Sequence, residues 1–253
     1  VAGADVGAPN VIASPARPFI DETSVPPGRL KIAWSAKAIN DAPVDAKVIS
    51  YLEKSVALLE SLGHELTEEA PQIHWPSYFD ALVTIWSANL AWTIETLGKI
   101  MDRVPGSDNL QRVTEAIYRH GLEISATEFL TAQGAFNQAN RAASALFGDY
   151  DLLLTPTLAK PPIKLGTLDQ NAAGIDPATW TRQVFEWCAF TPLFNSTGQP
   201  AISLPLHWTQ GGLPVGMQFV ASMNGEATLI RLAAQLEEAQ PWANRKPPIC
   251  YAG

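Results

Sequence analysis

The chain has 253 residues, of which 47% are hydrophobic and 17% charged, and its formal net charge is −8. This length allows one large α/β domain or a pair of smaller ones, and the absence of any Lys/Arg run or long apolar stretch predicts no nucleic-acid partner and no membrane partner. Because few residues are charged, much of the surface must be neutral or apolar. A missing half, a partner subunit or a homodimer face would cover such a surface. An ordinary composition rich in Ala, Leu and Pro explains the low charged fraction equally well.

The first segments in chain order predict a connector and then a strand–helix–strand unit. Residues 1–29 are rich in Pro, Ala and Gly without periodicity, which predicts an extended connector. Residues 30–75 predict two strands, Leu30–Trp34 and His64–Ala70, joined by a helix. Strands joined in this way are expected to be parallel, with a right-handed crossover.

The helix of this unit is amphipathic. Its start is expected at Asp41 and Pro43, and Gly63 stands where a helix commonly ends. Apolar residues recur along one face, at Val48, Leu52, Val56 and Leu59.

Residues 76–147 predict a segment of three helices. Pro and Gly interrupt it at Val104–Asn109, and Ser125 with Glu128 forms the sequence pattern of a capping box. The predicted helices are Tyr78–Met101, about Leu110–Glu123, and a third that runs from the capping box to Phe147.

Residues 148–253 predict the remaining strands and a C-terminal helix. Asp151–Thr155 is continuously apolar, as a buried strand is, and Pro156 should end its ladder. The other predicted elements are a loop over 158–179, a helix at Trp180–Phe190, strands at Ala201–Leu206 and Pro214–Ala221 joined as a hairpin, and a helix at Ala227–Ala239. The fold class is therefore α/β, with a sheet flanked by helices.

Two motifs near the C-terminus are the most informative. Phe194–Pro205 reads FNSTGQPAISLP, and Gly212–Val220 reads GLPVGMQFV. Gly198 permits a positive φ in the turn before the strand, Pro200 removes a backbone donor there, and Asn195 can bond neighbouring backbone groups and hold the turn. We interpret all three as scaffold residues.

These motifs resemble the C-terminal end of the amidase signature enzymes. Asp151–Thr157, which ends in Thr-Pro-Thr, and Glu226–Leu229 stand in the family's order as well. Within the family, the resemblance is to the branch of 6-aminohexanoate cyclic dimer hydrolase, which also has a tail like Pro241-Trp242. The resemblance implies the C-terminal half of the amidase signature fold, with a mixed β-sheet that runs through both halves.

The resemblance also implies amide hydrolysis by a Ser–Ser–Lys triad, with an oxyanion held by backbone N–H groups. The Gly- and Ser-rich segment that carries the family's serines is absent, and none of the lysines stands in the catalytic lysine segment. We therefore assign no catalytic residue, no metal and no cofactor to this chain. The triad is expected in an N-terminal half, which would be a covalent or separate partner. His207 follows a predicted strand and is interpreted as a loop histidine near the surface in preference to a general base.

The substrate-binding candidates are one threonine and four aromatic residues. Thr155 ends a buried strand, where open α/β sheets bind ligands. By resemblance, the long helix and the segment before Asn195 should cover the acyl channel, which selects Trp86, Trp92, Phe190 and Phe194. Each of these could instead be a core residue. An aromatic wall favours a small, uncharged aryl or alkyl amide, and no carboxylate or arginine is obviously placed to bind a charged end.

The cellular location and the alternative function follow from the remaining features. Cys188 and Cys250 show neither metal-ligand spacing nor the density of a disulfide scaffold, which favours the cytoplasm. The alternative to an enzyme is a non-catalytic truncated homologue that acts as a binding or interaction module. The apolar strands favour the enzyme, because such a module would expose strand edges and a large apolar face.

Overall fold

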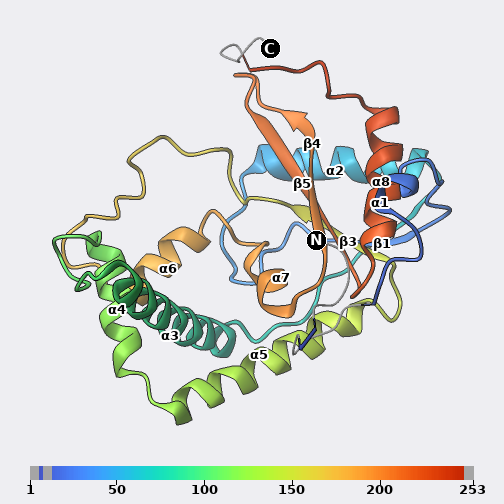
Figure 1. Ribbon diagram of the computed structural model, residues 1–253. Coiled ribbons are helices and arrows are strands. Elements are labelled where there is room, and N and C mark those ends of the chain that lie inside the picture. Colours follow the sequence, from blue (N-terminus) through green and yellow to red (C-terminus); the bar gives the residue numbers. More distant parts are fainter. Residues whose placement is uncertain (1–5, 8–12, 248–253) are drawn as a thin grey trace.

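The computed structural model describes residues 6–7 and 13–247, and these form an α/β fold around one five-stranded sheet (Figure 1). The strand order is β2-β1-β3-β5-β4. The strands are β1 (Lys31–Trp34), β2 (Glu65–Glu68), β3 (Leu152–Pro156), β4 (Ala201–Trp208) and β5 (Pro214–Ala221). β1 runs parallel to β2 and β3, whereas β5 is antiparallel to β3 and β4. The predictions of a mixed sheet, of parallel first strands and of a C-terminal hairpin are confirmed.

Helices cover both faces of this sheet. They are α1 (Phe19–Glu22), α2 (Ala46–Ser61), α3 (Trp75–Met101), α4 (Arg112–Glu123), α5 (Ala126–Leu146), α6 (Pro177–Phe185), α7 (Pro192–Thr197) and α8 (Glu226–Ala239). Alternate residues of β3 serve the two faces, as the strand period of two requires. Leu152 and Leu154 pack with α2 and α8, and Leu153 packs with α3, α5, α6 and α7. The far ends of α3 and α4 extend away from the sheet (Figure 1).

The predicted ends of α2 are right at one terminus and wrong at the other. Gly63 has φ +94°, and the amide of His64 donates to the carbonyl of Leu59 at 3.1 Å, which closes the helix as expected. The N-cap is Asp45, whose carboxylate accepts from the amide of Lys47, so the helix begins later than predicted. The structure also confirms the capping box of α5 at Ser125 and Glu128.

The N-terminal segment is not extended throughout. Residues 19–22 form the short helix α1 within the segment predicted as a connector. Its last residue, Glu22, is buried, and its carboxylate lies 2.6 Å from Nε of Arg231 on α8 and 3.2 Å from Nε of Arg17. The hydrogen bond from Arg231 lowers the pKa of this carboxyl. An ion pair across α1 and α8 therefore fixes the segment, which periodicity could not reveal.

The region before β4 also differs from the prediction. The helix expected at Trp180–Phe190 is α6, which begins earlier, after the N-cap Asp176. A separate helix, α7, follows where only a turn was expected, and Gly198 ends it with φ +77°. Both helices start with Pro, a residue that suits the first helical turn.

Candidate functional site

An aromatic wall joins α3 to α6. Trp75, Phe79 and Trp86 share one face of α3, and Phe185 of α6 packs against it. The Phe185 ring lies 6.1 Å from that of Trp75 and 5.7 Å from that of Trp86, the latter edge-on. The rings of Trp75 and Phe79 lie 5.3 Å apart. These are the distances at which aromatic pairs stabilise one another.

A cavity of about 350 Å³ lies beside this wall. Its lining combines the loop after β1, the start of α3 and the end of α6, with Asn40, Ala42, Pro43, Trp75, Arg182, Phe185 and Glu186. The volume lies within the range of small-molecule sites. The loop after β1 leaves the carboxyl end of a parallel strand, which is the edge where α/β sheets bind ligands.

The cavity wall carries three polar side chains. Asn40 donates from Nδ2 to the carbonyl of Phe185 at 2.9 Å and accepts at Oδ1 from the amide of Ala42 at 3.1 Å. Glu186 accepts from Nζ of Lys160 at 3.4 Å. The guanidinium of Arg182 lies over the ring of Phe79, 4.5 Å from its centre. Sequence analysis missed Arg182, although its spacing of three residues before Phe185 would have placed both on one face of α6.

The structure separates the five predicted substrate-binding residues. Trp86 lies in the aromatic wall and is 45% exposed. Trp92 is 70% exposed but lies about 240° further around the helix, so it faces another direction. Thr155, Phe190 and Phe194 are only 4%, 4% and 6% exposed. A residue that lines a channel between this chain and another part must be exposed in this chain alone, so burial favours a scaffold role for these three.

At the carboxyl end of β3, the Thr-Pro-Thr motif lies next to the two motifs that form β4 and β5. Thr155 accepts from Nε2 of Gln218 on β5 at 3.2 Å. The hydroxyls of Thr157 and Ser203 lie 2.6 Å apart, directly above Gly216. A Cβ at Gly216 would lie 2.6 Å from the Ser203 hydroxyl oxygen, closer than real contacts allow. Gly216 therefore leaves room for the side chains of Thr157 and Ser203 where β3, β4 and β5 pack together.

The turn before β4 is held by residues other than the expected one. Asn195 is exposed and makes no side-chain hydrogen bond within the described part of the chain, so its predicted role in holding the turn is not supported. Instead, the Thr197 hydroxyl donates to Oε1 of Gln199 at 2.7 Å, and both side chains are buried. Tyr78 of α3 adds a further bond, from its hydroxyl to the carbonyl of Pro192 at 2.8 Å. Burial raises the pKa of Tyr78 to about 12, so it remains a neutral donor.

The Gln199→Ala variant is expected to unfold more readily than the wild-type chain by about 1–3 kcal/mol, because the buried hydroxyl of Thr197 would lose its partner. Thermal or denaturant unfolding measures this loss. The control is Gln133→Ala, which changes an exposed glutamine of α5 and should leave stability almost unchanged. An unaltered melting temperature with a loss of function would contradict a scaffold role for Gln199.

His207 is not the surface loop residue that was expected. It belongs to β4, and its Nε2 lies 2.8 Å from the hydroxyl oxygen of Ser55 on α2. The pairing resembles a nucleophile and its base, but Ser55 is fully buried and also donates to the carbonyl of Tyr51. Because Ser55 has no access to a substrate, it cannot act as a nucleophile. The hydrogen bond between Ser55 and His207 therefore has a structural role, joining α2 to the sheet.

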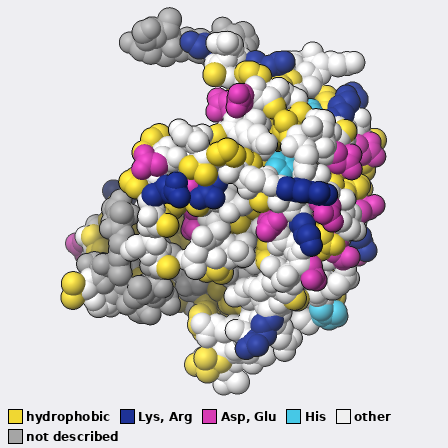
Figure 2. Space-filling model, turned by 90° about the vertical axis from the view of Figure 1, so that its right-hand side faces the viewer, with side chains coloured by type: hydrophobic (Ala, Val, Ile, Leu, Met, Phe, Trp, Pro, Cys, Tyr) yellow, Lys and Arg dark blue, Asp and Glu magenta, His cyan; other side chains and the backbone are white. Residues whose placement is uncertain are grey.

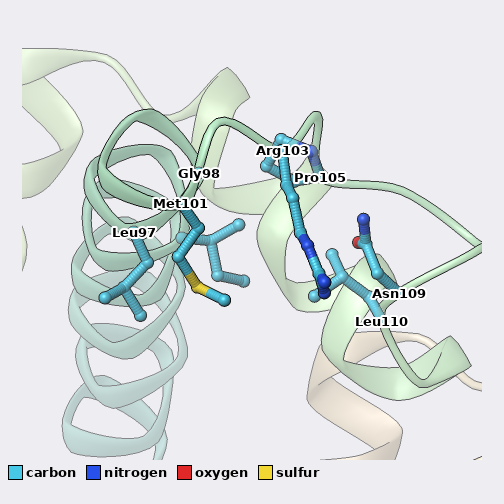
Figure 3. Close-up of a pocket in the computed structure, with 8 residues that line it drawn as sticks. Leu97, Gly98, Met101, Arg103, Pro105, Asn109 and Leu110 are labelled. Atoms are coloured by element: carbon cyan, nitrogen blue, oxygen red, sulfur yellow. The ribbon is translucent and has the colours of Figure 1, made fainter.

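A second hollow of about 180 Å³ lies at the far end of α3 (Figure 3). Leu97, Met101 and Leu110 supply its apolar lining, and the Arg103 side chain extends between Met101 and Asn109. It is smaller than the cavity beside the aromatic wall, and its lining comes from the end of α3 and the loop after it, not from the sheet edge, which makes it a weaker candidate for a substrate site.

We also searched the rest of the described chain for metal clusters, membrane-spanning helices and free thiols. Acidic and basic side chains are interspersed on the face shown in Figure 2. Among the described residues, no cluster of three or more His, Cys, Asp or Glu could hold a metal. No helix of the described residues is long and apolar enough to cross a membrane. Cys188 is a free thiol, and Cys250 lies outside the described residues.

Together, the mixed sheet, its two helical layers and the aromatic-walled cavity define an α/β protein with a ligand-sized cavity at the sheet edge. A model of the Amidase family matches residues 3–230, and the chain belongs to this family. The "Putative amidase AmiC" of Mycobacterium leprae (strain TN) is 36% identical over 194 residues, which cover 75% of this chain and 40% of that protein. 6-Aminohexanoate-cyclic-dimer hydrolase of Paenarthrobacter ureafaciens is 28% identical over 240 residues, 92% of this chain and 48% of that one.

Solved structures show the same fold. 6-Aminohexanoate cyclic dimer hydrolase complexed with substrate matches with a TM-score of 0.88 at 25% identity, over 97% of this chain and 52% of that one. A bacterial aryl acylamidase of the amidase signature family matches with a TM-score of 0.80 at 22% identity, over 96% and 50%. The predicted resemblance to amidase signature enzymes is confirmed. The chain spans about half the length of the curated relatives it matches.

Proposed function

We propose that this chain forms the substrate-binding half of an amidase that hydrolyses small aryl or alkyl amides. Water is consumed in the reaction: its hydroxyl ends on the acyl carbon, and its hydrogen ends on the leaving amine or ammonia. The nucleophile is a serine of a Ser–Ser–Lys triad in an N-terminal half, joined covalently or as a second chain. The enzyme acts in the cytoplasm.

One observation carries this proposal. In a chain of the Amidase family, Trp75 lines a ligand-sized cavity at the sheet edge, and Trp86, which packs edge-on against Phe185 in the same aromatic wall, is 45% exposed. An exposed tryptophan in such a place suits an apolar acyl group, since aromatic side chains line most small-molecule sites. The described side chains near the cavity include no nucleophile paired with a base, which is consistent with a triad outside this chain.

The first test is an assay of the complete polypeptide that carries these 253 residues, after intact-mass spectrometry has established its composition. Hydrolysis of aryl and alkyl amides is expected, with release of amine. If the complete polypeptide binds amides but never cleaves them, the non-catalytic binding module is the correct description.

Replacement of Trp86 by alanine is expected to change which acyl groups the enzyme prefers. The variant loses one side of the aromatic wall, so kcat/KM should fall by about tenfold for aryl acyl groups relative to acetyl. A substrate series measures the ratio. Trp92→Ala is the matched control, because Trp92 lies on the same helix and faces away from the wall. Identical ratios in all three proteins would remove Trp86 from the acyl site.

A further inference from the structure

Arg182 differs from the other polar residues of the cavity. The side chain of Asn40 is bonded at both its donor and its acceptor atoms, and Glu186 is paired with Lys160. Within the described part of the chain, the Arg182 side chain has neither a hydrogen bond nor an ion pair. Its contact is the face of the Phe79 ring.

This contact leaves the hydrogen-bonding edge of the guanidinium free. A guanidinium has five N–H donors in its plane, and stacking on a ring uses none of them. Glu186, the C-cap of α6, stands four residues after Arg182, but its carboxylate lies 3.4 Å from Nζ of Lys160. The cavity therefore carries a positive charge from Arg182 that no carboxylate of the described chain neutralises, although the whole chain has a net charge of −8.

We propose that Arg182 is a specificity-determining residue that binds a carboxylate on the acyl part of the substrate. The substrate class is then an amide of an aryl or alkyl acid that carries a second, anionic end, such as a monoamide of a dicarboxylic acid. This inference rests on the proposed amidase function and replaces the sequence-based expectation of an uncharged substrate. The apolar part of the acyl group lies along Trp75 and Trp86, and the amide end points to the catalytic half.

The physical basis is the match between guanidinium and carboxylate. Two parallel N–H···O bonds form between them, and bonds of this charged kind are stronger than neutral ones. Loss of the pair should lower kcat/KM for the anionic substrate by about 10- to 100-fold. A neutral analogue makes no such bonds, so a change at Arg182 should lower its kcat/KM less than that of the anionic substrate.

Two substrates test this, the monoanilide of hexanedioic acid and the anilide of hexanoic acid, which differ in the terminal carboxylate. The complete enzyme is expected to prefer the first. In Arg182→Met, whose alkyl chain still covers Phe79, that preference should disappear, measured as the ratio of kcat/KM for the first anilide to kcat/KM for the second. Arg182→Lys should recover part of the preference, because it restores the charge without the planar fork.

The controls separate this inference from the proposed function. Arg112→Met changes an exposed arginine at the start of α4 and should keep the preference. Equal preferences in wild type and Arg182→Met overturn the inference and leave the amidase intact. If neither anilide is hydrolysed, the proposed function fails. Tryptophan fluorescence titration with the anionic anilide then tests Arg182 without turnover: equal affinities for wild type and Arg182→Met overturn the inference, and weaker binding by the variant supports it.

Discussion

The Gly121→Ala variant is expected to lose about 3 kcal/mol of folding stability, because the added methyl group has no room. Gly121 is buried on α4 where that helix crosses α3. A Cβ there would lie 2.0 Å from the carbonyl oxygen of Ser87 and 2.8 Å from Cβ of Ala91. The oxygen belongs to the backbone, so only a separation of the two helices relieves the clash. Calorimetry should show the melting temperature lowered by about 6–12 °C.

The matched control is Gly134→Ala in the middle of α5. This glycine is exposed, and nothing lies within 4 Å of the position that its Cβ would occupy. Alanine is the better helix former, so the control should gain about 0.5–1 kcal/mol. If Gly121→Ala is as stable as wild type, the close crossing of α3 and α4 is contradicted. The test also concerns the site, since α3 carries the aromatic wall.

The sequence predicted most of the elements because their signals are local. The capping box of α5 and the glycine that ends α2 act within a few residues, and both are in place. The strands were found from apolar runs and turn residues. The error at α6 and α7 arose where a local signal was present but not used, since Asp176-Pro177 is a helix start and Pro192 is another.

The candidate site could be predicted only in part, for a different reason. Trp86 was selected as a candidate for the wall of the acyl channel, which stays a prediction, and its ring partner Phe185 comes from a helix distant in the sequence. Only the packing of α6 across α3 places Arg182 over Phe79. Phe190 and Phe194 are buried, which favours a scaffold role, and sequence alone cannot distinguish such residues from pocket residues. A pattern reports which face of a helix is apolar but not what covers it.

Lowering the pH from about 6.5 to 4 is expected to destabilise the fold through His207. Burial, with Lys54 nearby, lowers the pKa of His207 from 6.5 to about 4. Its ring stacks on Tyr51 at 5.1 Å, and its Nε2 faces the Ser55 hydroxyl. Between these two pH values the unfolded chain binds a proton at His207 and the folded chain does not. Stability therefore falls as the pH falls, by about 2–3 kcal/mol over the whole window.

The variant that isolates this effect is His207→Gln, whose side-chain amide can still donate to Ser55 but does not titrate in this range. Urea unfolding at several pH values should give a flatter dependence between pH 6.5 and 4 for this variant than for wild type. His74→Gln, which changes an exposed histidine before α3, should keep the wild-type slope. The carboxyl of Glu22 has a lowered pKa, so the stability that it contributes is lost only as the pH falls below 4.5, its pKa in the unfolded chain. Glu22 therefore does not account for a loss of stability above pH 4.5. Equal slopes for wild type and His207→Gln would mean that His207 is already charged or well solvated in the folded chain, and the contact between α2 and β4 would have to be looser than the 2.8 Å bond implies.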